Sequence, residues 1–101
     1  MNRLRDHNYF VYITSNPGRT VLYTGVTNDL NIRIQQHKSN KGIPTTFAGK
    51  YYCYELIYYE RYSDINIAIE REKEIKLMKR ETKFAMIKAV NPLLATINVY
   101  E

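Results

Sequence analysis

Several residue types that commonly stabilise or localise small proteins are scarce or absent in this chain of 101 residues. Cysteine occurs once, at Cys53, which excludes an internal disulfide framework and a zinc site built from several cysteines. We therefore expect a reducing, cytoplasmic compartment. Tryptophan is absent, and no apolar run approaches the length of about 18 residues that is typical of a membrane-spanning helix. The N-terminal stretch MNRLRDHNYF lacks the apolar region of a secretory signal peptide.

Tyrosine and positive charge are the two features that the chain has in excess. Ten tyrosines accompany three phenylalanines, and 15 Lys and Arg residues outnumber 10 Asp and Glu residues, for a formal net charge of +5. This charge favours polyanionic partners such as nucleic acid. The hydrophobic fraction of 45% is typical of a globular protein, and the length predicts a single domain over residues 1–101.

The pattern of apolar and turn residues predicts an α+β fold with the element order β-β-α-β-α-α. Strands are expected at residues 9–14 (YFVYIT), 19–24 (RTVLYT) and 51–59 (YYCYELIYY). Helices are expected from a cap at residue 27 or 28 through residue 37, from residue 65 to about 78 after a cap at residue 63 or 64, and from about 81 to 90. Residues 38–50 are expected to form a basic loop. A three-stranded sheet covered by helices follows from this order.

The turn at Asn16-Pro17-Gly18 predicts how the first two strands pair. If residues 16–19 form a four-residue turn, Tyr12 lies opposite Tyr23, and both rings lie on one face of the sheet. A bulge at the turn would shift this pairing by one residue. A cross-strand pair of tyrosines is, by itself, an ordinary stabilising contact.

The first predicted helix carries two polar residues in its apolar stripe. Leu30, Arg33, Ile34 and His37 follow one another at helical spacing, so they share one face. Taken singly, Arg33 is explained by a stem that lies on the core and a head group in solvent. His37 is explained by hydrogen bonding at the end of the helix.

The second predicted helix carries a carboxylate in the middle of its apolar face. Glu72 follows Ala68 and Ile69 and precedes Ile75 on the same face. A buried carboxylate needs a cation, which can be an Arg or Lys side chain or a bound metal. An arginine, a metal-binding carboxylate, and a phenol or imidazole base are together what phosphodiester hydrolysis requires.

The spacing of these residues resembles a known family of nucleases. Phe10-Val11-Tyr12 and Tyr23-Thr24-Gly25 resemble the two half-motifs of the GIY-YIG nuclease superfamily, and Arg33 follows ten residues after Tyr23 as in that family. Glu72, within AIEREKEIK, falls where the family places its metal-binding glutamate. The segment LMKRETKFAMIKAVNP resembles the tail of the small stand-alone members, and the resemblance covers roughly residues 9–92.

Three positions depart from the family pattern. Phe10 replaces the glycine of the first half-motif, and Thr24 replaces the usual apolar residue between Tyr23 and Gly25. Val26 stands where the excision-repair members, which carry this domain at the N-terminus of the incision subunit, have a lysine. The last difference removes one candidate for activating the base.

The resemblance implies a small sheet of three antiparallel strands flanked by helices, and a DNA endonuclease that uses one divalent metal, Mg²⁺ or Mn²⁺. It implies that Tyr12 and Tyr23 lie at the scissile phosphate, that Arg33 binds this phosphate, and that Glu72 binds the metal. His37 matches a histidine that is frequent after the arginine in small members. Asn91 matches a late polar residue of the family.

The identity of the general base stays open between Tyr12, Tyr23 and His37. A tyrosine with a pKa of about 10 is mostly protonated near neutral pH. It would therefore need a lower pKa, which Arg33 and a metal on Glu72 could provide. His37 has an ordinary pKa near 6.5 and would need no such change.

The lysines predict how DNA would be held. Lys38, Lys41 and Lys50 in the loop, and Lys76 and Lys79 in the later helices, suit backbone phosphates, with little base specificity. A solvated helix face explains part of this set equally well. We expect structure-selective or non-specific cleavage in DNA repair or recombination. The alternatives are a nucleic-acid-binding module without catalysis, and a subunit that is active only within a larger nuclease assembly.

Overall fold

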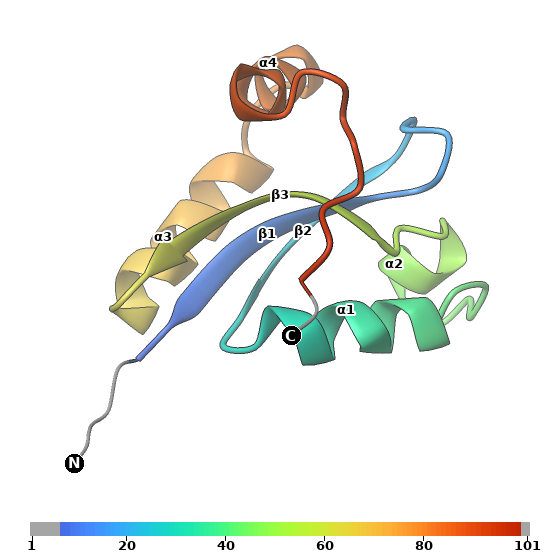
Figure 1. The fold of residues 1–101 in the computed structure, drawn as a ribbon, viewed down its shortest axis with the longest axis horizontal. Coiled ribbons are helices and arrows are strands. Elements are labelled where there is room, and N and C mark those ends of the chain that lie inside the picture. Colours follow the sequence, from blue (N-terminus) through green and yellow to red (C-terminus); the bar gives the residue numbers. More distant parts are fainter. Residues whose placement is uncertain (1–6, 100–101) are drawn as a thin grey trace.

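A three-stranded antiparallel sheet forms the centre of the computed structural model, which describes residues 7–99 (Figure 1). The strands lie in the spatial order β2-β1-β3 and comprise β1 (Tyr9–Ser15), β2 (Leu22–Thr27) and β3 (Glu55–Tyr62). The helices are α1 (Leu30–Ser39), α2 (Phe47–Lys50), α3 (Ile65–Lys76) and α4 (Arg80–Val90). The predicted α+β class and element order are confirmed, with α2 as an additional single turn.

The central strand β1 sends its side chains into two separate cores, because successive residues of a strand point to opposite faces. Val11 and Ile13 enter the core beneath α3 and α4, where they pack with Ile57, Tyr58, Ala68, Ile75 and Ile87. Tyr12 enters the core on the other face, with Leu30, Ile34 and Leu56. In Figure 1, α1 lies below the sheet and α4 above it. No helix within residues 7–99 is long and apolar enough to span a bilayer.

The connection between β1 and β2 is longer than predicted. The turn at residues 16–19 forms, with the Arg19 amide donating to the Asn16 carbonyl at 3.0 Å, but Arg19 has a positive φ of 59°. The Asn16 side chain then accepts hydrogen bonds from the amides of Thr20 and Val21 at 2.8 and 2.9 Å. These two residues therefore stay outside the ladder, and β2 begins at Leu22 rather than at residue 19.

The longer connection shifts the strand register by two residues. Tyr12 lies opposite Gly25, and Tyr23 lies opposite Thr14, so the predicted pairing of Tyr12 with Tyr23 is wrong. A shift of two residues preserves the face to which each side chain points. Tyr12 and Tyr23 consequently remain on the same face, as diagonal neighbours.

The third strand begins four residues later than predicted. Tyr51 ends α2 as its C-cap, and Tyr52 adopts a positive φ of 60°, which interrupts the extended backbone. The Cys53 amide then donates to the Ala48 carbonyl at 2.8 Å, and regular pairing starts only at Glu55. The aromatic residues that suggested a strand thus form the exit from α2.

Acidic side chains begin both of the longer helices that border the site. Asp29 caps α1 by accepting a hydrogen bond from the Ile32 amide at 3.0 Å, so the caps expected at Thr27 or Asn28 are wrong. Asp64 caps α3, one of the two positions expected there. Because α1 starts at the end of β2, its apolar stripe faces the Tyr12 side of the sheet.

Candidate active site

The candidate active site is built around the side chain of Tyr12, which is fully buried. Its ring crosses β2 at Gly25, where an added Cβ atom would lie 2.5 Å from the Tyr12 hydroxyl oxygen. Any larger residue at position 25 would therefore displace the tyrosine. The glycine of the second half-motif is required for space across the two strands.

Two side chains from α1 hold the Tyr12 hydroxyl group. Arg33 Nε donates a hydrogen bond to the hydroxyl oxygen at 3.1 Å, and His37 Nε2 lies 2.8 Å from the same oxygen. An arginine can only donate, so the Tyr12 hydroxyl keeps its own proton free to donate to His37 Nε2. The direction of this bond depends on the tautomer of His37: the hydroxyl donates when the imidazole proton is on Nδ1 and accepts when it is on Nε2. Arg33 and His37 are one helical turn apart, as the stripe predicted.

Tyr23 completes the cluster from β2. Its ring centroid lies 6.2 Å from that of Tyr12 and 5.3 Å from that of His37, and the rings of both tyrosines meet the imidazole edge-on. His37 is 6% exposed as a result. The two tyrosines, Arg33 and His37 thus form one contiguous group. The strand register from which the proximity of the tyrosines was predicted is nevertheless wrong by two residues.

Burial controls protonation within this group. It raises the pKa of Tyr12 to about 12, in spite of the opposing effect of Arg33. Burial, followed by the charge of Arg33, lowers the pKa of His37 to about 4. Burial lowers the pKa of Arg33, but its hydrogen bonds with Tyr12 and Tyr23 outweigh this effect and raise it above the ordinary value. Near neutral pH, Tyr12 therefore keeps its proton and His37 is neutral. Arg33 lowers the pKa of Tyr12, but by too little to offset burial, as a tyrosine base would have required.

Glu72 approaches the group from α3, on the other side of the sheet. Its side chain is 15% exposed, and one carboxylate oxygen, Oε2, lies 3.1 Å from Lys76 Nζ. Its charge is a minor contribution to the raised pKa of Tyr12, which places the carboxylate within electrostatic range of that hydroxyl. Lys76 is the cationic side-chain partner that one explanation for a buried carboxylate requires. The other explanation, a bound metal, applies to the same carboxylate.

A metal ion would find few protein ligands at this site. Within residues 7–99, no three His, Cys, Asp or Glu side chains gather in a way that could hold one. Mg²⁺ nevertheless commonly binds through one or two carboxylates, with water and substrate phosphates as the other ligands. The single hard oxygen donor group of Glu72 fits Mg²⁺ or Mn²⁺ bound together with a substrate.

A small cleft of about 170 Å³ opens beside the cluster, between α1 and α2. Its lining joins predicted site residues to residues from the unpredicted helix α2 and its approach: Tyr23, Arg33, His37, Asn40, Thr46, Phe47 and Ala48. A guanidinium and an imidazole thus face a space that is large enough for a phosphate group. The sequence signal for α2 was limited to Thr46 as a potential cap, followed by only four helical residues.

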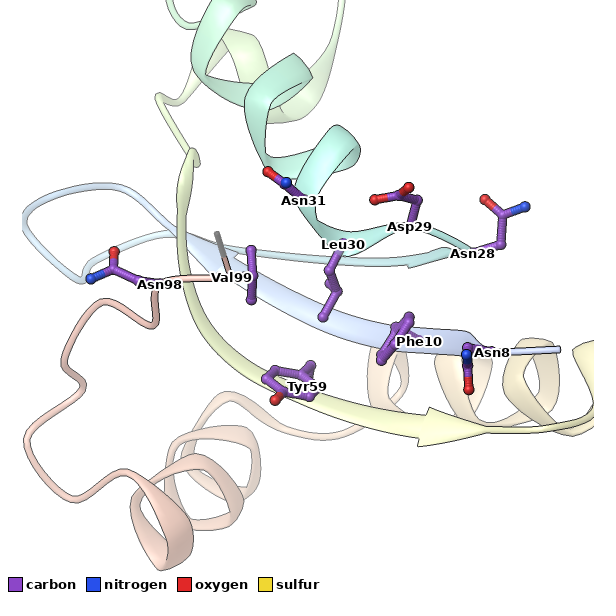
Figure 2. A pocket seen from close by; sticks show the side chains of 9 residues that line it. All are labelled: Asn8, Phe10, Asn28, Asp29, Leu30, Asn31, Tyr59, Asn98 and Val99. Carbon is purple, nitrogen blue, oxygen red and sulfur yellow. The ribbon is translucent and has the colours of Figure 1, made fainter. Parts of the chain in front are cut away.

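A larger pocket of about 510 Å³ lies near the start of β1 and α1 and has different chemistry (Figure 2). In Figure 2, the side chains of Phe10, Leu30, Tyr59 and Val99 occupy its middle, and four asparagines lie around them. Among residues 7–99, its lining includes none of the five predicted catalytic residues and no cationic side chain. Size alone is therefore a poor guide to the candidate site, and the titratable groups favour the smaller cleft.

Asn91 is not part of the cluster. Its side-chain amide donates to the carbonyls of Ile57 and Ala95 at 2.8 and 2.9 Å and accepts from the Ala95 amide at 3.1 Å. These bonds fix the segment after α4 to β3, at the opposite edge of the sheet from β2. The contacts give Asn91 a structural role.

The five predicted DNA-binding lysines lie in different surroundings. Lys76 pairs with Glu72, and Lys79 is exposed at the start of α4. Lys50 Nζ lies 5.3 Å from the ring centroid of Tyr51, and Lys41 Nζ lies 5.1 Å from that of Tyr54. Lys38 has an electrostatic interaction with Glu55 at the start of β3. Among these contacts, only that of Lys76 is to a predicted site residue, Glu72.

Comparisons with known proteins agree with this geometry. Residues 8–85 match the family described as the GIY-YIG catalytic domain. A UPF0213 protein of Staphylococcus epidermidis is 40% identical over 80 residues, covering 78% of this chain and 93% of that protein. A UPF0213 protein of Staphylococcus aureus is 35% identical over 80 residues, covering 79% of this chain and 94% of that protein. The solution NMR structure of a UPF0213 protein from Bacillus halodurans superimposes with a TM-score of 0.54 and 27% identity, over 85% of this chain and 88% of that one.

The names of these relatives state no activity, whereas the domain match covers both half-motifs, Arg33 and Glu72. The chain belongs to the GIY-YIG family and is similar to its small UPF0213 proteins.

Proposed function

We propose that the protein is a metal-dependent endonuclease that hydrolyses phosphodiester bonds of DNA. The observation that carries this proposal is the buried Tyr12 hydroxyl, held between the Arg33 guanidinium and a neutral His37, both of which line a cleft of about 170 Å³. An arrangement of this kind, within a GIY-YIG catalytic domain, suits the activation of water next to a bound phosphate.

In this proposal, Tyr12 and His37 act as a pair that accepts the proton of the attacking water. The Tyr12 oxygen takes the water proton while its own proton passes to His37 Nε2 over the hydrogen bond of 2.8 Å. The attacking oxygen bonds to phosphorus, and the bond to the leaving oxygen breaks. Tyr12 need not become a phenolate in the free protein, which agrees with its raised pKa. Tyr23 orients the imidazole through its ring contact.

Arg33 and Glu72 supply the electrostatic part of the mechanism. Arg33 lines the cleft and would bind the non-bridging oxygens of the phosphate, where negative charge increases during the reaction. Glu72 would hold the divalent metal, which when bound supplies positive charge at the phosphate. Lys76 competes with that metal for the same carboxylate, because it is already paired with Glu72.

The proposed substrate interaction is mainly with the DNA backbone. Lys41, Lys50, Lys76 and Lys79 would contact phosphates, so affinity would decrease with salt and depend little on base sequence. We propose that such an enzyme acts in DNA repair or recombination.

The experiment that tests the function measures cleavage of nicked, branched, single-stranded and duplex DNA, with and without Mg²⁺ or Mn²⁺. We expect metal-dependent cutting that falls by two or more orders of magnitude in Glu72→Ala and in Arg33→Ala, while both variants stay folded. Glu70→Ala is the matched control, because Glu70 is an exposed carboxylate on the same helix. Near-native cutting by Glu72→Ala would reject the site. Binding without turnover, unchanged by Glu72→Gln, would favour a binding module without catalysis.

A further inference from the structure

Three aromatic rings lead from the candidate active site to the surface. The Tyr23 ring stacks on Phe47 with centroids 6.4 Å apart and an interplanar angle of 27°, and Phe47 meets Tyr51 at 4.8 Å. Tyr23 is half-buried, whereas Phe47 and Tyr51 are 52% and 41% exposed. Large exposed rings in a row beside a cleft are not explained by packing in the hydrophobic core, so they indicate a binding surface.

The local backbone holds these rings in place. The Thr46 side chain caps α2 by accepting from the Gly49 amide at 3.0 Å. Gly49 packs so closely on the preceding loop that a Cβ atom there would lie 2.5 Å from the Ile43 carbonyl oxygen. The Gly42 amide also donates to the Gly49 carbonyl at 2.8 Å. The exposed rings are therefore presented by a fixed turn of helix.

The surroundings of the rings indicate what could cover them. Lys50 lies over the outer ring, that of Tyr51, and the Lys41 ammonium lies over the ring of Tyr54, further along the same segment. A flat aromatic surface bordered by ammonium groups is complementary to a nucleotide, which has a flat base and an anionic phosphate. An apolar peptide would gain nothing from the lysines. Bases inside a duplex are already stacked on both faces, so these rings favour an unpaired base.

The position of Phe47 connects this surface to the proposed chemistry. Phe47 lines the cleft of about 170 Å³ together with Arg33 and His37. A base that stacks on Phe47 would therefore belong to a nucleotide adjacent to the phosphate bound by Arg33.

We infer that Phe47 and Tyr51 form a stacking surface for unpaired nucleotides immediately beside the scissile phosphate. The inference rests on the proposed function and specifies its substrate class, namely DNA in which the strand is unpaired where it is cut. Single strands, flaps and bubbles are then substrates, and fully paired duplex is a poor one.

The test uses a short single strand that contains 2-aminopurine, whose fluorescence is quenched when it stacks on an aromatic ring. Titrations of the full chain in EDTA measure binding without cleavage. We expect quenching with the native protein and at least about fivefold weaker binding, with loss of quenching, in Phe47→Ala. Phe47→Tyr should behave like the native protein, because it retains a flat ring. Tyr51→Ala should weaken binding by a smaller factor.

Two controls separate stacking from other effects. Tyr59→Ala removes an equally exposed ring, 43% exposed, from the larger pocket of Figure 2, and it should change nothing. Loss of binding in Tyr59→Ala but not in Phe47→Ala would overturn the inference, since it would place the base in that pocket. Phe47→Leu keeps an apolar side chain without a flat face. If Phe47→Ala unfolds in a thermal melt, Phe47→Leu replaces it, and native quenching by Phe47→Leu would also overturn the inference.

Cleavage assays in Mg²⁺ distinguish the failure of this inference from failure of the proposed function. Native-rate cutting of single strands by Phe47→Ala, with duplex cut equally well by the native protein, would leave an endonuclease and overturn the stacking surface. Conversely, ring-dependent quenching in EDTA without any metal-dependent cutting would support the stacking surface and reject hydrolysis.

Discussion

Two polar clusters that contain tyrosine lie on opposite faces of the same sheet, and they differ in how completely their hydrogen bonds are used. On the α3 face, Glu60 accepts from Arg71 Nε and Nη2 at 2.9 Å each, from Tyr62 at 2.6 Å, and from Tyr58. Burial opposes the charge of Glu60, but these four bonds outweigh it and hold its pKa at about 2. Both carboxylate oxygens are saturated, and no further ligand is needed.

The cluster on the α1 face is built from similar residue types but is incomplete. Tyr12 has its two partners, whereas His37 Nδ1 has no hydrogen-bond partner within residues 7–99. Arg33 faces a cleft as well as the hydroxyl group. Unused donors and acceptors next to a cleft, rather than the presence of buried polar residues, therefore single out the cluster on the α1 face as the candidate site.

The largest expected difference between the two clusters appears when the arginine of each is replaced in turn. Arg33→Met should reduce cleavage by two or more orders of magnitude, with a small change in the free energy of unfolding. Arg71→Met should leave Glu60 without its cation, which costs on the order of 2 kcal/mol of folding stability, and cleavage per folded molecule should stay near native. Urea unfolding and kcat/KM measure the two quantities. Equal loss of activity in both variants would show that the distinction is wrong.

The sequence predicted which residues gather at the candidate active site better than it predicted the strand register. Arg33, His37 and Glu72 each interrupt an apolar stripe, and helical spacing is reliable enough to place them on faces that point to the sheet. The hairpin register depended on the Asn16 side chain, which binds the amides of Thr20 and Val21 and delays the start of β2 to Leu22. Such a side-chain bond has no periodic signature, so the pairing of Tyr12 was wrong by two residues.

The region around α2 could not be predicted because its signals conflict. Tyr51 and its neighbours have high strand propensity, yet they follow a single helical turn that exists because Gly49 fits against the preceding loop. Close backbone packing of this kind depends on tertiary contacts. The saturated cluster was missed for a related reason, since Glu60 and Arg71 are brought together only when α3 packs on β3.

Acid titration distinguishes the two clusters, because their protonation should lower the stability of the fold in different pH ranges. The folded pKa of His37, about 4, lies below its ordinary value of 6.5, so the unfolded chain binds more protons between these pH values. Stability should therefore fall as the pH drops from about 6.5 to 4, by on the order of 3 kcal/mol at most. The folded pKa of Glu60, about 2 against an ordinary 4.5, predicts a further loss at lower pH.

Denaturant unfolding at a series of pH values checks both ranges. His37→Gln keeps a hydrogen-bond acceptor for Tyr12 but does not titrate, so it should flatten the curve above about pH 4.5 and leave the lower range unchanged. Glu60→Gln should do the reverse. A native curve that stays flat between pH 6.5 and 4.5 would mean that His37 gains its proton as easily in the folded chain as in the unfolded one, contrary to its burial.

The smallest expected effect concerns the two glutamates. Glu60 is held by saturated bonds, whereas Glu72 is paired with a lysine that is 51% exposed, and a pair of this kind contributes about 0.2–1 kcal/mol. Lys76→Met should therefore lower the Mg²⁺ concentration for half-maximal cleavage by about two- to fivefold, and less at high salt. DNA affinity is measured separately, because Lys76 is also a proposed phosphate contact. Lys73→Met, an exposed lysine on the same helix, is the matched control. A higher Mg²⁺ requirement in Lys76→Met, at saturating DNA, would show that the lysine supports the metal site rather than competing for Glu72. Glu60 and Glu72 would then both depend on their cationic partners, and the difference between the two clusters would be smaller than their hydrogen bonds suggest.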